Sequence, residues 1–225
     1  MTMSFEHSHV VRAAFPNLVC STLRIGGLTS DVDASPFSRL HIDRARDRLS
    51  RQSEGDWPEI QAWRRAFSAM GLKPTQYRCA AEALLRRLRK DGELPSLHPL
   101  IDICNAISVA FAIPIAVFDT DRIEGGLMVK PAQGDERYHA FSGAMETPEP
   151  GEIIFADGEG RAHSRRWTNR QSAASAVGPV TSNALIVAEA LHTDADADMI
   201  ALKAAVQEAV STLWPTVHWA DRGAA

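Results

Sequence analysis

Cysteine is scarce in this chain, where Cys20, Cys79 and Cys104 are scattered over 225 positions. No two of them form the C-x-x-C pair that a thiolate zinc site would need, and an odd, dispersed set does not encode a disulfide framework. The sequence therefore predicts three free thiols that are buried as small apolar side chains.

Long apolar runs are also missing. The longest, Ala106 to Phe118, is too short to cross a bilayer and contains Pro114. The first residues, MTMSFEHSHV, lack the basic start and the apolar stretch of a signal peptide. We therefore expect a cytoplasmic protein without a membrane partner.

Signatures of cofactor and metal binding are absent from the sequence too. It contains neither a Walker A pattern nor the glycine pattern of a dinucleotide-binding fold. The acidic run DADAD (194–198) resembles the start of a calcium loop, but Met199 and Ala205 stand where such a loop needs glycine and glutamate. Acids at a helix N-terminus explain this run. We expect no metal and no cofactor.

Charge is present, and it is unevenly distributed. The formal net charge is −4, yet basic residues outnumber acidic ones between Arg39 and Lys90. The stretches RRLRK (86–90) and RAHSRRWTNR (161–170) contain no acid at all. Local fields rather than net charge decide where a polyanion docks, so both stretches are candidates for phosphate contacts. In the first stretch, cations in the last turns of a helix would also suit the helix dipole.

Hydrophobic periodicity and helix-end signals predict an α+β fold. Strands are expected in 17–28, in IPIAVFD (113–119) and in RAHSRRW (161–167), and a strand continuing past 167 would place Arg165, Trp167 and Asn169 on one face. Helices are expected after Asp56 as N-cap, from Thr75 as N-cap to Gly92, from Pro99, and over 194–214. Helices first and strands later, without steady βαβ alternation, favour one compact domain over 1–225. Its central mixed or antiparallel sheet would be flanked by helices. The two ends, 1–15 and 216–225, are expected to be flexible.

A polar stripe interrupts the most apolar segment, PLIDICNAISVAFAIPIAVFD (99–119). Asp102, Asn105 and Ser108 recur every three residues, so they lie along one side of a helix, and His98 extends the stripe. Buried polar groups cost about 1–3 kcal/mol each unless they find partners. The partners are either backbone groups of adjacent loops or a ligand, and the amide of Asn105 suits both an ester carbonyl and a water.

The segment LPSLHPLIDICNAISVAFAIPIAVFDTDRIEGGLMVKPAQGDE (94–136) resembles the tRNA-editing domain of the phenylalanyl-tRNA synthetase beta subunit. With IQAWRRAFSAMGLKPTQYRCAAEALLRRL before it and GEIIFADGEGRAHSRRWTNRQ after it, the chain is still more similar to free-standing proteins built from that domain alone. These pieces cover residues 57 to 171 in the order of the family. The resemblance implies the fold of that domain and a tRNA partner.

The resemblance also implies an activity, the hydrolysis in trans of the ester that joins a wrong amino acid to the acceptor end of a tRNA. By position, the Thr-Asn pair of the family falls on Cys104 and Asn105, while Ala116 replaces the histidine of its H-A-F-D motif. Either other groups carry the chemistry, or the substrate differs, or no hydrolysis occurs. An aminoacyl ester is already activated, so a positioned water and a few donors aimed at the oxyanion can suffice.

The site residues expected on this basis form three groups. The catalytic group is Asn105, which would orient the ester or the water, with Asp102 and Ser108. The substrate pocket is expected to include Cys104, Ala116, His98, Trp167 and Asn169. The tRNA would be held by Arg165, Arg166 and Arg170 and by Arg86, Arg87, Arg89 and Lys90, since arginines beside a tryptophan suit phosphate contacts and base stacking.

Alternatives to these roles stay open. Trp167 is alternatively a core residue with Arg166 paired to a buried acid, Glu82 is expected to pair with Arg86 one helical turn on, and a lone histidine in a strand, such as His163, is usually structural. At the level of function, the alternatives are a non-catalytic RNA-binding module and a binder or hydrolase of a small aminoacyl compound.

Overall fold

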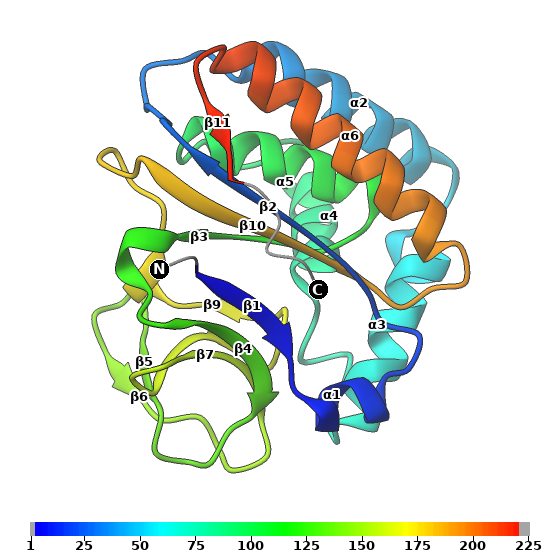
Figure 1. Ribbon diagram of the computed structural model, residues 1–225. Coiled ribbons are helices and arrows are strands. Elements are labelled where there is room, and N and C mark those ends of the chain that lie inside the picture. The colour runs from blue at the N-terminus through cyan, green and yellow to red at the C-terminus, as the bar shows by residue number, and fades with distance from the viewer. Residues whose placement is uncertain (1–2, 221–225) are drawn as a thin grey trace.

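The computed structural model describes residues 3–220, with most helices in the first half of the chain and most strands after them (Figure 1). The helices are α1 (His9–Ala14), α2 (Ser35–Arg51), α3 (Pro58–Ala69), α4 (Ala80–Asp91), α5 (Pro99–Phe111) and α6 (Ala195–Leu213), with short 3-10 helices at Glu54–Asp56, Thr120–Arg122 and Ala173–Ser175. The strands are β1 (Ser4–His7), β2 (Val19–Gly26), β3 (Ile115–Asp119), β4 (Gly126–Pro131), β5 (Arg137–His139), β6 (Met145–Glu146), β7 (Ile153–Asp157), β8 (Arg161–Arg165), β9 (Arg170–Gln171), β10 (Asn183–Ala190) and β11 (His218–Trp219).

The strands divide between two sheets. The larger has the order β1-β4-β7-β8-β5-β6, with β9 paired to β8, and the smaller has the order β11-β2-β10-β3. In the larger sheet β1 runs parallel to β4 and β5 runs parallel to β8, so this sheet is mixed. The smaller sheet is antiparallel, and helices cover the face that points away from the larger sheet (Figure 1). The expected α+β class with sheets flanked by helices is confirmed.

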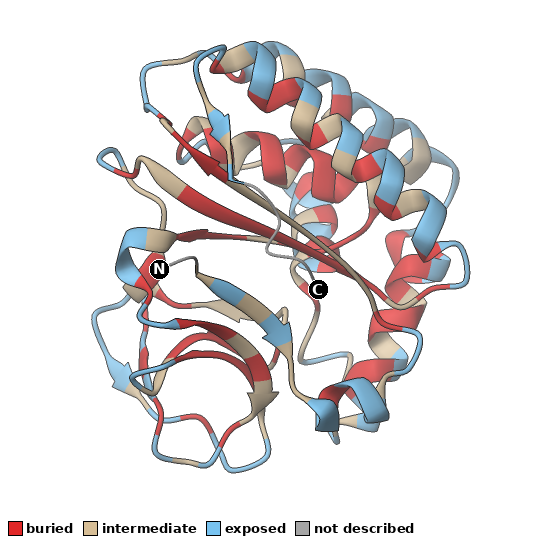
Figure 2. Cartoon of the chain, viewed as in Figure 1, coloured by how far each residue is buried: buried red, intermediate tan, exposed pale blue. Residues whose placement is uncertain are grey.

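The smaller sheet separates two apolar cores. Leu185 and Val187 of β10 face one core with Trp63 and Phe155, while the alternate residue Ile186 faces the other with the helices α5 and α6. Every residue of β10 after Asn183 is buried, as expected for a strand that is covered on both faces (Figure 2). Burial of each large apolar side chain contributes about 1.5–3 kcal/mol, so these two cores hold the layers together.

The start and the end of helix α5 are set by its capping residues. His98 is the N-cap, and its side chain accepts a hydrogen bond from the backbone N–H of Leu100, while Pro99 occupies the first turn, where no N–H is needed. At the other end Ala112 adopts a left-handed conformation with φ 55°. Sequence signals therefore locate this helix correctly.

Two expected N-caps are wrong. Asp56 lies in the 3-10 helix before α3, whose N-cap is Trp57, and α4 begins at Ala80 rather than after Thr75. The segment before α4 cannot continue the helix backwards, because the N–H of Ala80 donates to the carbonyl of Thr168 in a distant loop. Tertiary contacts thus override the local capping signal.

The segment expected as one strand through Trp167 ends earlier. β8 stops at Arg165, and both Arg166 (φ 49°) and Trp167 (φ 57°) are in the left-handed region, which is uncommon for residues other than glycine. The chain therefore turns sharply here, and side chains after Arg165 do not alternate between two faces as they would in a strand.

The two ends are partly built into the sheets. β1 and α1 lie within 1–15, and β11 lies within 216–225, although both segments were expected to be flexible. Residues 1–2 and 221–225 of these two segments lie outside the described residues. Within 3–220, no helix combines the length and the apolar character that crossing a membrane requires.

Candidate functional site

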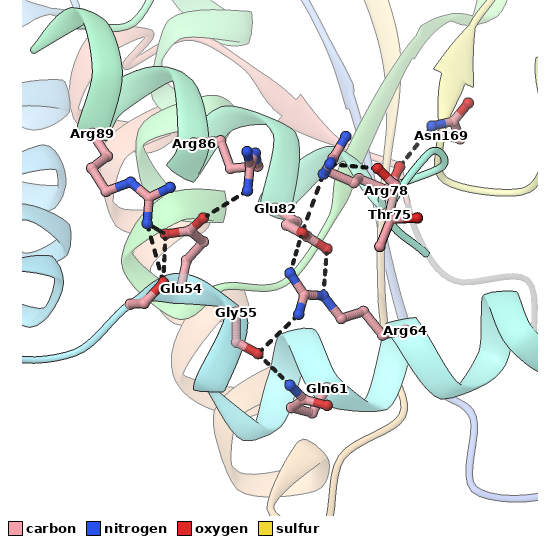
Figure 3. A network of polar contacts seen from close by, with 11 residues as sticks. Glu54, Gly55, Gln61, Arg64, Thr75, Arg78, Glu82, Arg86, Arg89 and Asn169 are labelled. Carbon is pink, nitrogen blue, oxygen red and sulfur yellow. Dashed lines mark hydrogen bonds and ion pairs between the residues drawn. The ribbon is translucent and has the colours of Figure 1, made fainter. Parts of the chain in front are cut away.

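Two arginines of α4 form ion pairs with one buried carboxylate (Figure 3). Glu54, whose side chain is 1% exposed, pairs with Arg86 at 3.5 Å and with Arg89 at 2.7 Å. Because the two arginine side chains are 43% and 44% exposed, part of each guanidinium still faces solvent. One carboxylate shared by two guanidiniums leaves one positive charge uncompensated.

A second buried carboxylate, Glu82, acts in the same way between α3 and α4. It pairs with Arg64 at 2.7 Å and with Arg78 at 3.4 Å, and hydrogen bonding to Glu82 raises the pKa of Arg64. The expected pair between Glu82 and Arg86 is wrong. Figure 3 shows the reason, since Glu82 faces α3 while Arg86 points to Glu54.

The surface of α3, α4 and the residues just before α4 therefore carries an excess of positive charge, and we call it the basic face. In its ion pairs six cations share the three carboxylates Glu54, Glu82 and Asp91. The cations are Arg64, Arg78, Arg86, Arg87, Arg89 and Lys90. Asp56 is near enough to act on Arg64 and reduces the excess somewhat. The pairs of Arg87 and Lys90 with Asp91 are exposed and therefore weak, so a phosphate can compete for these two cations.

Two of the arginines expected to contact RNA are held by carboxylates in the larger sheet. Arg165 is 6% exposed and lies between Glu146 (2.6 Å) and Glu152 (2.8 Å). Hydrogen bonding to Glu152 raises the pKa of Arg165 well above its usual range. Arg170 donates to both oxygens of Glu146 at 3.0 Å. Arg165 is thus an internal ion pair and not a solvent-facing group.

The turn after β8 brings Arg166 and Asn169 next to the basic face but leaves Trp167 in the core. Arg166 lies over the ring of Tyr77 at 4.6 Å. The amide of Asn169 donates to the carbonyl of Arg78 at 2.8 Å (Figure 3). Trp167 is fully buried, and its indole N–H donates to Glu189 at 2.9 Å. Of this group, Arg166 can extend the basic face, whereas Trp167 fits the alternative of a core residue.

The polar stripe of α5 meets three different environments. Both oxygens of Asp102 accept hydrogen bonds, from Ser96 Oγ at 2.7 Å and from the N–H of Leu97 at 2.8 Å. Ser108 is buried and donates to the carbonyl of Ile113 at 2.6 Å, so its hydroxyl closes the end of α5 instead of facing a substrate. The half-buried Asn105 makes no side-chain hydrogen bond to any described residue.

Cys104 and Ala116, both expected in the substrate pocket, lie on opposite sides of the smaller sheet. Cys104 belongs to the core beneath α5, and burial raises the pKa of its thiol to about 12. Ala116 is half-buried against the other core, which it shares with Trp167. The structure therefore does not bring Cys104 and Ala116 into one pocket.

His98 and Asp102 do line a common cavity of about 470 Å³, between the start of α2 and the loop that leads into α5. We call it the α2–α5 pocket. Ser38, Arg39 and Arg46 of α2 also line it. Sequence reasoning missed these three, although their spacing places them on one side of a helix.

Two polar atoms of this pocket have no partner among the described residues, Oγ of Ser38 and Nε2 of His98. Nδ1 of His98 accepts from Leu100, and burial lowers the pKa of His98, so the neutral ring carries its proton on Nε2. A buried donor without a partner costs about 1–3 kcal/mol. A bound molecule would remove this cost.

A serine–histidine–aspartate arrangement is present at β8 but is buried. Nδ1 of His163 lies 2.7 Å from Ser175 Oγ, and its Nε2 lies 3.1 Å from Asp157 Oδ2. Hydrolases place the serine on Nε2 and the acid on Nδ1, so the ring is reversed here. His163 and Ser175 have no exposed surface. The group is structural, in line with the usual role of a lone strand histidine.

Comparison with known proteins places this geometry in context. The family model described as the B3/4 domain matches residues 62–207. The beta subunits of phenylalanine–tRNA ligase from Cereibacter sphaeroides and Bartonella henselae are 35% identical over 74 residues and 30% identical over 94 residues. These matches cover 33% and 42% of this chain but only 9% and 12% of the relatives.

A solved structure shares the fold. It is an N-terminal fragment of the phenylalanyl-tRNA synthetase beta subunit from Pyrococcus horikoshii, with a TM-score of 0.52 and 12% sequence identity. The match covers 95% of this chain and 49% of that fragment.

Proposed function

Because the chain belongs to the B3/4 domain family, we propose that it binds the acceptor end of a charged tRNA and hydrolyses the ester of a mischarged amino acid in trans. The basic face is the observation that carries the proposal. Six cations there share three carboxylates. Four of these cations, Arg64, Arg78, Arg86 and Arg89, are held in place by ion pairs with the buried Glu82 or Glu54. Such a fixed array contacts the phosphates of a folded RNA with little loss of side-chain freedom.

The chemistry of hydrolysis is compatible with the side chains near α5. A water attacks the ester carbonyl, the bond to the ribose oxygen breaks, and the neighbouring ribose hydroxyl helps to return a proton to that oxygen. The protein has to orient the ester and stabilise the developing oxyanion. The amide of Asn105 has no hydrogen-bond partner within residues 3–220, which leaves both its donor and its acceptor available for this task. Asp102 would act as a positioning residue, since both its oxygens hold the loop before α5.

A deacylation assay tests this function. A panel of mischarged tRNAs is incubated with the wild type, with Asn105→Ala and with the matched control Asn183→Ala, in which an asparagine of β10 is removed. We expect Asn105→Ala to slow deacylation by about 10²-fold with unchanged tRNA affinity, and the control to behave as the wild type. Equal rates for Asn105→Ala and the wild type would remove Asn105 from the reaction.

A non-catalytic RNA-binding module is the second candidate. Ala116 in place of the family histidine and the internal hydrogen bond of Ser108 favour it. The same assay separates the two, because a module of this kind binds tRNA but leaves the half-life of every aminoacyl ester unchanged. Release of the amino acid above the spontaneous rate excludes it.

A further inference from the structure

Arg166 has an unusual backbone conformation in the turn after β8. Its φ of 49° lies in the left-handed region, and the next residue, Trp167, follows there with φ 57°. Residues other than glycine stay in this region only where surrounding contacts enforce it, and such positions cluster at ligand sites. The N–H of Arg166 donates to Glu152 at 2.9 Å, and the N–H of Trp167 donates to the carbonyl of Ile153 at 2.6 Å. Residues at the start of β7 thus enforce the conformation of this turn.

The same turn is hydrogen-bonded to the segment that precedes α4. The side-chain amide of Asn169 donates to the carbonyl of Arg78 at 2.8 Å, across 91 positions of the chain (Figure 3). The N–H of Ala80 donates to the carbonyl of Thr168, also at 2.8 Å. Two bonds between the same two segments fix their relative position, so Tyr77 in the second segment lies at a defined place beside the turn.

The guanidinium of Arg166 lies over the ring of Tyr77, 4.6 Å from its centroid. Both residues are half-buried, so solvent reaches them. Within residues 3–220 this guanidinium forms no hydrogen bond and no ion pair, in contrast to that of its neighbour Arg165. Glu152 acts on its charge, but both oxygens of Glu152 already accept from Arg165. The N–H groups of the Arg166 side chain are therefore available to a ligand.

A guanidinium stacked on an aromatic ring fits an unpaired nucleotide. Flat bases stack on aromatic rings and on guanidinium planes alike, and the N–H donors of an arginine reach a phosphate or the edge of the base. Bases inside a duplex are covered on both faces by their neighbours and cannot stack in this way. The position also suits RNA, because Arg78, whose carbonyl accepts from Asn169, belongs to the basic face.

We propose that Arg166 and Tyr77 form a stacking platform for an unpaired nucleotide at the end of an RNA stem that lies on the basic face. The inference rests on the proposed function, since the acceptor end of a tRNA is such a single-stranded end. The cations of the basic face contact phosphates of the stem. The base of the overhang stacks on the guanidinium of Arg166, and Tyr77 supports the other face of that guanidinium.

Two RNA hairpins with the same stem test the platform on the full chain. One ends in a single-stranded A-C-C-A overhang and the other is blunt, and fluorescence anisotropy measures the affinity of the protein for each. We expect the overhang to strengthen binding about tenfold, the gain that one stacked base typically gives. In a third probe the last base is a fluorescent purine analogue whose emission is quenched by stacking. Its emission should fall when the wild type binds.

Three variants remove the platform in different ways. Arg166→Gly deletes the side chain without strain, because glycine tolerates φ 49°. Arg166→Lys keeps the charge but loses the planar group, and Tyr77→Leu removes the ring. Each variant is expected to bind the overhang and the blunt hairpin with equal affinity. The matched control is Arg44→Ala, since Arg44 of α2 also lies over an aromatic ring, that of Phe111, at 5.4 Å. It should keep the tenfold difference.

The inference is overturned if the wild type binds both hairpins equally, if Arg166→Gly or Arg166→Lys keeps the difference, or if the purine analogue is not quenched. Its failure is separate from that of the proposed function. A preference for the overhang that depends on Arg166, without deacylation of any tRNA, would exclude hydrolysis and leave the platform. Deacylation by a protein that does not distinguish the two hairpins would exclude the platform and leave the function.

Discussion

Buried carboxylates decide where the arginines of this protein point. Glu54 and Glu82 orient the cations of the basic face, and Glu152 holds Arg165 inside the larger sheet. Burial by itself would raise the pKa of Glu152, but the hydrogen bonds and charges of Arg165 and Arg166 together outweigh that effect and lower the pKa. A carboxylate of this kind is costly to bury alone and stabilising only with its partner.

Asp157 allows the stabilising effect of a paired, buried carboxylate to be measured. Burial would raise its pKa, but hydrogen bonds from His163 and Arg161 outweigh burial and hold the pKa well below the usual value of 3.8. A carboxyl whose pKa is lower in the folded state stabilises the fold above its unfolded pKa, and this contribution is lost as the pH falls toward the folded pKa. Stability should therefore decline below about pH 4.

The matching variant is Asp157→Asn. We expect it to lower the free energy of unfolding by about 3 kcal/mol at neutral pH and to flatten the decline in acid. Urea unfolding at a series of pH values provides the measurement. The exposed Asp135→Asn is the control and should follow the wild type. If the variant lost stability in acid as steeply as the wild type, Asp157 would not contribute to the loss of stability at low pH.

Roles of single residues were the hardest to predict from the sequence. The placement of Arg165, Trp167 and Asn169 on one face assumed a continuous strand, and the left-handed turn at 166–167 breaks that alternation. Glu82 was assigned to a neighbour one turn along its own helix, yet its partner Arg64 comes from α3. Periodicity along one element carries no information about an ion pair between two elements.

At the scale of elements, the sequence predicts α5 and β3 well, because a capping residue, a proline in the first turn and an apolar pattern agree there. The start of α4 was placed too early, since the N–H of Ala80 is claimed by Thr168. Its end was placed correctly at Gly92, which adopts φ 80° in the left-handed region. That end also shapes the candidate site, because residues 93–97 lead directly into the α2–α5 pocket.

Gly92→Ala is expected to lower the free energy of unfolding by about 1 kcal/mol, because a side chain is strained at this positive φ. An added Cβ meets no atom within 4 Å, so strain alone is measured. The control is Gly178→Ala, where the added Cβ is also free of contacts but φ is not positive. Denaturant unfolding compares the two, and equal midpoints would contradict the assignment of α4's end.

At the scale of the whole molecule, the α+β class and the family were accessible from the sequence, but the division into two sheets was not. Strand order depends on pairings between distant segments, such as β1 with β4, which local patterns do not reveal. The same holds for charge. The net value of −4 hides a basic face, and only the fold shows which acids neutralise which cations.

The basic face predicts a strong salt dependence of tRNA binding. Contacts to about four phosphates give a slope of about −3 to −4 in log affinity against log salt. Arg87→Glu with Lys90→Glu, the two cations paired only to Asp91 among described residues, should reduce the magnitude of this slope by about two. Filter binding at several salt concentrations measures it. The exposed Arg137→Glu on β5 is the control, and an equal loss there would point to non-specific attraction.

The pairing of β1 has a consequence for biosynthesis. His7 of this strand meets Glu189 at 2.6 Å, across a separation of 182 positions in the chain. A nascent polypeptide leaving the ribosome exposes His7 long before Glu189 has been translated. β1 can pair with β4 once residue 131 has been made, whereas its contact with Glu189 of the smaller sheet can form only after β10 has been made. The two sheets can therefore join through His7 only late in the synthesis of the described residues.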